Sequence, residues 1–226
     1  MATLADYRAR LRLDLMDPAG SAQRFTDADL DRAITRAVGE YQRAAPRPLT
    51  AQLTTTPGSR ELSLVALAGL LEVVRVEYPV GRYPPAYPPF RVAPDRTLLT
   101  LLVPAPPAGA EPVILDCDAA HTVDAAQSTL PAGHEAIVLR GAYGFACEAF
   151  ATQAGDNFRY EDGQDTGLVD DTAIPRRWAE RAREALAWFR GELARLRDER
   201  TAALTARAVW SSTPVEDRRS RIRRDE

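Results

Sequence analysis

Apolar residues recur at helical spacing in two segments near the N-terminus. In residues 2–16 the leucines gather on one side, and Thr3 stands where an N-cap is needed. A second segment opens at Thr26, which can form a capping box with Asp29, and its apolar side chains continue at intervals of three and four. Pro46 cannot continue this helix. The pattern therefore predicts two amphipathic helices at the start of the chain.

The middle of the chain, residues 49–118, changes to the alternation that is typical of strands. Turn residues, mainly Pro and Gly, separate the strand-like stretches. The expected strands are residues 49–57, 60–65, 72–78, 90–93, 97–103 and 112–117. The Pro- and Tyr-rich stretch 79–90 cannot form a helix or a central strand. We therefore expect a small antiparallel sandwich or barrel of about six strands.

Residues 133–153 are apolar around almost the whole helical circumference, which predicts a helix buried on all sides, by this chain or by other copies of it. Gly141 and Gly144 keep this helix thin, so neighbouring backbones can approach it closely. A second long helix is expected from Pro175 to about residue 210, with an apolar seam at alternating intervals of four and three. The seam runs through Trp178, Ala182, Ala185, Leu186, Phe189, Leu193, Leu196, Ala203 and Leu204.

These elements predict an α+β fold. We expect a helical bundle of two N-terminal helices, one buried central helix and one long C-terminal helix, with an inserted antiparallel β-sandwich-like module and an extended C-terminal tail. The expected helical domain comprises residues 1–48 and 119–210, because helices from both ends of the sequence must meet. The inserted β-module is residues 49–118, and the tail arm is residues 211–226.

Composition narrows the functional classes. The chain has 226 residues with a net charge of -3, so bulk electrostatics does not favour binding to nucleic acid. Its two cysteines form neither a disulfide framework nor a CxxC motif. The N-terminus is charged and amphipathic, unlike a signal peptide, and no stretch is apolar enough for a transmembrane helix. We expect a protein made in a cytoplasm, with no membrane partner.

Three groups of motifs occur in a characteristic order. They are Leu15-Met16-Asp17 followed by residues 25–34 (FTDADLDRAI) and 41–46 (YQRAAP); residues 74–79 (VRVEYP) with 87–90 (YPPF); and residues 120–123 (AHTV) with 129–131 (TLP) before an Ala/Gly-rich helix. Together they resemble the head–tail adaptor, or neck and connector, proteins of tailed bacteriophages. The resemblance is to the larger type, which carries a β insertion, and it spans most of residues 3–155.

This resemblance implies a structural virion protein at the head–tail interface. Such adaptors form rings, commonly of twelve subunits, that dock on the portal protein, extend the DNA channel and attach a tail or nozzle protein. DNA passes through without sequence-specific binding. The family has no catalytic residues and no cofactor, so we expect neither an enzyme nor a metal site.

Three sets of residues are candidates for contacts with partners. A run of arginines in the tail would grip the portal: Arg218, Arg219, Arg221, Arg223 and Arg224. Four acids in the same tail nearly cancel that charge, which favours an arm docking on an acidic protein over one binding nucleic acid. Subunit packing is expected at Gly141, Gly144, Trp178 and Phe189, and a tail-side surface loop at Tyr83, Tyr87 and Phe90.

Two groups of residues allow other chemistry. Asp116, Cys117, Asp118 and His121 suggest a metal cluster, although the spacing is not that of a zinc site. The acidic residues of 156–171 suggest Ca²⁺ binding, but Phe158 and Tyr160 fall where EF-hand ligands belong. A solvated loop, or an acidic surface for a basic partner, also fits that segment. The alternative functions are thus a β-module that binds glycan or fibre and, third, a metal-dependent hydrolase.

Overall fold

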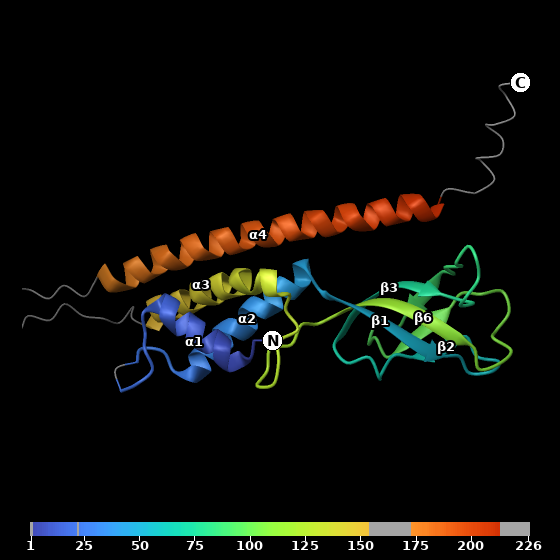
Figure 1. The fold of residues 1–226 in the computed structure, drawn as a ribbon, viewed down its shortest axis with the longest axis horizontal. Helices are drawn as coiled ribbons and strands as arrows, with labels where there is room; N and C mark the ends of the chain where they lie inside the picture. The colour runs from blue at the N-terminus through green and yellow to red at the C-terminus, as the bar shows by residue number, and fades with distance from the viewer. Residues whose placement is uncertain (1, 22, 154–172, 213–226) are drawn as a thin grey trace, which may run out of the picture. The chain divides into compact units, whose positions relative to one another are not determined.

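A computed structural model describes residues 2–21, 23–153 and 173–212. In these ranges the chain is α+β, as predicted, with four α-helices and two small three-stranded antiparallel sheets (Figure 1). The chain divides into two compact units, Met1–Ala142 and Tyr143–Glu226, with the division inside the third helix. The predicted division into a helical domain, a β-module and a tail arm remains a prediction.

The first unit begins with the two predicted helices, α1 (Leu4–Leu15) and α2 (Asp27–Ala44). Both start with a complete capping box, Thr3 with Asp6 and Thr26 with Asp29, in which each side chain bonds the backbone N–H of the other residue. These boxes satisfy amide groups that would otherwise lack partners at the helix starts. The predicted N-caps Thr3 and Thr26 are confirmed. The second helix ends at Ala44, just ahead of Pro46 as expected.

The six predicted strands are present. They are β1 (Arg47–Thr54), β2 (Glu61–Ser63), β3 (Leu70–Glu77), β4 (Phe90–Val92), β5 (Leu98–Leu101) and β6 (Pro112–Ala119). One sheet has the order β1-β6-β3 and the other β2-β5-β4, and every pairing is antiparallel. Strand β1 starts two residues earlier than expected and contains Pro48. An edge strand tolerates proline because its outward N–H needs no ladder partner.

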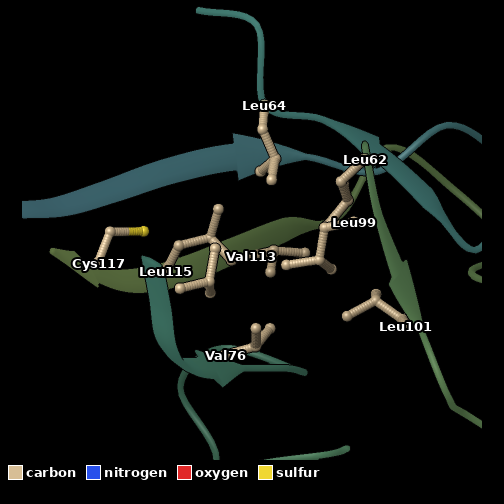
Figure 2. Close-up of a cluster of buried hydrophobic side chains, with 9 residues drawn as sticks. Leu62, Leu64, Val76, Leu99, Leu101, Val113, Leu115 and Cys117 are labelled. Carbon is tan, nitrogen blue, oxygen red and sulfur yellow. The ribbon is translucent and has the colours of Figure 1, made fainter. Parts of the chain in front are cut away.

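The two sheets share one apolar core. Figure 2 shows side chains from β2, β3, β5 and β6 converging between the sheets, among them Leu62, Val76, Leu99 and Leu115. Leu99 and Leu115 are completely inaccessible to solvent. Because consecutive strand residues point to opposite faces, the alternation seen in the sequence is what brings one face of each strand into this core.

The central helix α3 (Glu135–Gln153) follows a short 3₁₀ turn, η1 (Ala132–His134). Most of its apolar side chains are buried, including Val138 and Cys147, which are both fully inaccessible. Within the described chain, burial on every side does not extend to the end of the helix. Ala149 is exposed and Phe150 is only half-buried. The helix therefore has more apolar surface than the described chain itself covers.

The longest helix is α4 (Ala173–Ser212, 40 residues; Figure 1), which belongs to the second unit. Pro175 sits in its first turn as predicted. The apolar seam is buried from Trp178 to Leu196. The seam then emerges into solvent, because Ala203 and Leu204 are exposed. The described chain therefore covers the predicted seam only as far as Leu196.

Candidate interaction surfaces

The joint between α1 and α2 is organised by a buried arginine. The Arg12 Nη1 donates to the Asp17 carboxylate over 3.1 Å, and its Nη2 donates to the Asp27 carboxylate over 2.7 Å and to the Phe25 carbonyl over 3.1 Å. Arg12 is 8% exposed and Asp17 only 2%. A guanidinium presents several donors in a fixed fork, so one side chain can tie the end of α1 to the start of α2.

Asp17 completes this joint from the loop side. Its two carboxylate oxygens accept the backbone N–H groups of Arg24 and Phe25 over 2.7 and 3.1 Å. A buried carboxylate with a cation and two amide donors is well satisfied, so the chain between the helices is held in one conformation. The acids of both N-terminal motifs, Asp17 and Asp27, therefore meet at Arg12. Sequence reasoning noted both motifs but missed Arg12, because nothing local marks it as buried.

Gly144 lies where α3 and α4 are in close contact in the second unit. A Cβ atom at this position would lie 2.8 Å from the Leu186 side chain and 3.3 Å from the Ala185 side chain. No ordinary side chain fits at the first of these distances without movement of the neighbour. The packing reason that the sequence suggested for glycine in this helix is therefore visible at Gly144. Gly141 is buried as well.

The two aromatic residues proposed for subunit packing are buried in the second unit. Phe189 is fully inaccessible, and its ring meets that of Phe145 edge to face with centroids 6.2 Å apart. Trp178 is 6% exposed, and its ring centroid lies 4.9 Å from that of Phe150. Both contacts join α4 to α3 of the same chain. A role in contacts between subunits stays a prediction.

The surface loop predicted within residues 79–90 leaves one tyrosine fully exposed. Tyr83 is 99% exposed, and Tyr87 is 39% exposed. The Arg75 guanidinium lies 4.4 Å from the centroid of the Tyr87 ring, which restrains that side chain by a cation–π contact. Phe90 begins β4 and packs partly against the β-module core. Thus only Tyr83 of the three projects freely.

Asp116 is engaged in a cross-strand cluster on the sheet β1-β6-β3. Its carboxylate accepts from the Arg75 Nη2 over 2.6 Å and from the Thr50 hydroxyl over 3.1 Å. Asp116 raises the pKa of Arg75 above its ordinary value through this hydrogen bond. The three residues stand opposite one another in the strand register. Such pairs stabilise a sheet and account for both carboxylate oxygens without a metal.

The remaining residues of the suggested metal cluster have structural roles. Cys117 is 3% exposed in the β-module core, and burial, together with Asp116 and Asp118, raises the pKa of its thiol to about 11. Asp118 is also buried, at 8% exposure, and has an interaction partner. Both ring nitrogens of His121 lie within hydrogen-bonding distance of protein oxygens. A ring with both nitrogens engaged in this way has no lone pair left for a metal.

His134, the last residue of η1, has a specific partner. Its Nδ1 lies 2.6 Å from the Tyr41 hydroxyl, and the two rings are 5.8 Å apart in an edge-on arrangement. Tyr41 is 1% exposed, and burial raises its pKa to about 12. The phenol is therefore neutral at ordinary pH, and this pair links α2 to η1.

Two predicted surfaces lie outside the described residues. They are the acidic segment 156–171 and the arginine run Arg218, Arg219, Arg221, Arg223 and Arg224. Within residues 2–21, 23–153 and 173–212, no group of three or more His, Cys, Asp or Glu side chains is arranged to hold a metal ion. Across the same ranges, no helix has both the length and the apolar character required to cross a membrane.

Comparison with known proteins gives a partial likeness to solved structures. No protein-family model matches the chain, and no curated protein matches it. Among solved structures, it is similar to a chain in a structure described as the neck of an empty GTA particle computed with C6 symmetry. The two chains are 20% identical over 78% of this chain and 88% of that one, with a TM-score of 0.30. A TM-score this low does not establish a shared fold, so the function proposed below rests on the chain's own residues and architecture.

Proposed function

We propose that this chain is a structural protein of a phage-like neck, a head–tail adaptor that forms a ring, docks on a portal protein and carries the tail or nozzle. The observation that carries the proposal is the order of its elements. A capped helix pair is followed by a β insertion directly after α2, then by α3 and the long α4. This is the order expected from the adaptor family that the sequence motifs resemble.

The motifs behind that resemblance have a physical role in the fold. Thr26 and Asp29 form the capping box of α2, and Asp17 and Asp27 hold Arg12. Together they connect the end of α1 to the start of α2. The pattern of an aromatic residue, Thr, acid, any residue, acid and Leu is thus explained by the construction of a rigid helix pair.

The final helix supports a role in assembly. At 40 residues α4 is about 60 Å long, roughly twice the diameter of a small domain. Up to residue 205, the last buried residue of this helix is Leu196, and residues 201–205 are all exposed. Helical stability in proteins comes mostly from packing of an apolar face, so a helix extending this far beyond its buried seam gains from a partner. A neighbouring copy or the portal would supply that partner.

The proposed mechanism is mechanical. Copies of the chain, twelve in the family it resembles, surround a channel through which DNA passes without sequence-specific contact. The tail arginines, Arg218 to Arg224, pair with acidic groups of the portal. The β-module, with Tyr83 exposed at its surface, faces the next tail component or the outside of the particle. The protein carries out no catalysis, in keeping with the structural partners of Asp116 and His121.

The direct test is to mix the purified chain with the portal ring of the same particle. Native mass spectrometry and electron microscopy should show a ring complex of fixed stoichiometry. The proposal is overturned if no association occurs at any salt concentration. Glycan binding by the full chain, with no portal binding, would instead favour the alternative of a glycan- or fibre-binding β-module.

A second test isolates the tail. Removing residues 211–226 should abolish docking on the portal and leave the unfolding transition unchanged. The matched variant keeps the full length and replaces Arg218, Arg219, Arg221, Arg223 and Arg224 with Gln. If charge is what grips the portal, both variants lose docking. Unchanged docking in both would remove the tail from the mechanism.

A further inference from the structure

The chain enters and leaves the β-module at one place. Helix α2 ends at Ala44 and β1 begins at Arg47, while β6 ends at Ala119. Arg47 and Ala119 are paired in the strand register, so they are the last rung of the ladder. These two connections between the helix pair and the β-module, called crossings below, are therefore adjacent. A contact that joins them determines how firmly the β-module is attached to the helix pair.

A single side chain, His121, joins both crossings. Its Nε2 lies 3.0 Å from the carbonyl oxygen of Ala45, the C-cap residue of α2. Its Nδ1 lies 3.1 Å from the Thr129 carbonyl oxygen and 3.2 Å from the Thr129 hydroxyl. Its backbone N–H donates to the Gln42 side-chain oxygen over 3.2 Å. The ring is only 7% exposed, so these contacts form away from solvent.

The same partners can form hydrogen bonds with the neutral ring of His121 or with the protonated ring, but the hydrogen atoms are placed differently in the two cases. In the neutral ring, Nε2–H donates to the Ala45 carbonyl and Nδ1 accepts from the Thr129 hydroxyl. In the protonated ring, Nδ1–H donates to the Thr129 carbonyl instead. The Thr129 hydroxyl then turns to the Thr122 carbonyl, 3.3 Å away. One proton therefore redirects the bond between His121 and the loop that leads to η1.

The surroundings oppose the charged state. Burial is the largest cause that lowers the pKa of His121; the two carbonyls raise it, and the charges of Arg47 and His134 lower it again. The Arg47 Nε is itself buried with no hydrogen-bond partner in the described part of the chain. From α2, the ring faces Tyr41, 5.3 Å away between centroids, which stays neutral. The buried carboxylate of Asp118 stands near the end of β6, three residues before His121, and is itself engaged in an interaction.

We propose that His121 is a proton-sensitive clasp between the helix pair and the β-module. In its neutral form it holds both crossings together, and protonation weakens the attachment by placing a cation in a buried site beside Arg47. Acidification therefore loosens the β-module from the end of α2. The unfolded chain takes up the proton near pH 6.5, before the folded chain does. The stability that the clasp supports is thus complete above about pH 6.5 and is lost as the pH falls toward the lower pKa of the folded state.

The experiment uses the fact that the chain has only two histidines. The NMR spectrum of the full chain should therefore contain the ring signals of two histidines. In the variant His134→Gln only the signal of His121 should remain, which assigns it. We expect that signal to titrate below about pH 6.5, the value for an unperturbed histidine. A midpoint at or above that value overturns the proposal without any variant at His121 itself.

Hydrogen exchange tests the loosening. Between about pH 7 and about pH 5, the protection factor of the His121 amide should fall several-fold. The uptake of one proton can change it by at most roughly tenfold per pH unit. In His121→Gln, which cannot titrate, the protection of the neighbouring Ala120 amide should become independent of pH over that range. In the matched control His134→Gln, that pH dependence should persist. Equal pH dependence in all three proteins would show that His121 is a passive structural residue.

Discussion

Arg12 and Asp17 form a buried ion pair, with Nη1 and Oδ2 separated by 3.1 Å, at the turn between α1 and α2. Neither side chain is more than 9% exposed. The pair satisfies the donors and acceptors of a loop that would otherwise bury unpaired polar groups. It thus converts two short amphipathic helices into one rigid unit, and the most informative mutations lie here.

Asp17→Ala should destabilise the protein strongly. The substitution leaves Arg12 buried with only Asp27 as a charged partner, and it removes the acceptor of the Arg24 and Phe25 amides. Breaking a buried pair from one side typically costs about 3–5 kcal/mol, and the remaining Asp27 contact places the expectation at the lower end. Urea unfolding measures the loss. The control Asp14→Ala, on the exposed side of α1, should stay within about 0.5 kcal/mol of the parent. Similar losses in the two variants would contradict the role given to Asp17.

Thr26→Ala should cost about 1 kcal/mol by removing the N-cap of α2. The Thr26 hydroxyl and backbone lower the pKa of Asp29, so the charged carboxylate is the form that stabilises the folded state. This contribution is present above about pH 4, the ordinary pKa of Asp, and is lost as the pH falls through the lowered folded value. Unfolding curves at about pH 7 and about pH 3 should therefore differ less in the variant than in the parent. Thr35→Ala, an exposed threonine within α2, is the control, and an equal loss there would show that capping is not the cause.

Gly144→Ala should destabilise the α3–α4 pair, although alanine favours helices. The new methyl group would lie 2.8 Å from Leu186, and overpacking of this kind costs typically about 1–3 kcal/mol. The control is Gly191→Ala on α4, where a Cβ meets nothing within 4 Å. That change should stabilise by about 0.5–1 kcal/mol because glycine is the poorer helix former. Shifts of the same sign in thermal unfolding would show that α3 and α4 are not in close contact at Gly144.

Trp188→Ala and Phe189→Ala should separate assembly from folding. Phe189 is fully buried, so its truncation should cost about 3–5 kcal/mol. Its neighbour Trp188 is 47% exposed, and its truncation should change stability much less. If α4 contributes to the proposed ring, Trp188→Ala should still weaken ring formation, as measured by native mass spectrometry. Normal assembly of this variant would exclude the Trp188 face of α4 from the ring contact.

Cys117 should be unreactive in the folded protein. Its thiol is buried, and its pKa of about 11 lies well above the value of about 8.5 for a free cysteine. In a Cys147→Ala variant, a thiol reagent at about pH 8 should therefore label Cys117 only at the rate at which the chain opens, and rapidly in urea. The raised pKa also predicts how stability changes with pH. Stability should fall as the pH rises above about 8.5, because the unfolded thiol loses its proton first. Rapid labelling of the native chain would contradict the buried position of Cys117.

Local patterns in the sequence determined most of the elements. The capping boxes at Thr3 and Thr26 and the start of α4 near Pro175 depend on interactions within a few residues, and the six strands follow a local alternation of apolar and polar residues. Such interactions are fully encoded by spacing, and they were predictable for that reason. Burial, in contrast, depends on what the rest of the fold places over a side chain. Ala149 and Leu204 carry the right apolar pattern for burial, but no part of the described chain covers them.

The tertiary structure alone decided which polar residues meet. Arg12 lies 15 positions from Asp27, and His121 lies 76 positions from Ala45, so no local pattern could pair them. The same applies to Asp116, which the sequence offered as a metal ligand and the fold pairs with Arg75, 41 residues away. Amphipathic periodicity reports which face of an element is turned inward. It does not report what that face will contact, because the contacts depend on how distant segments are brought together.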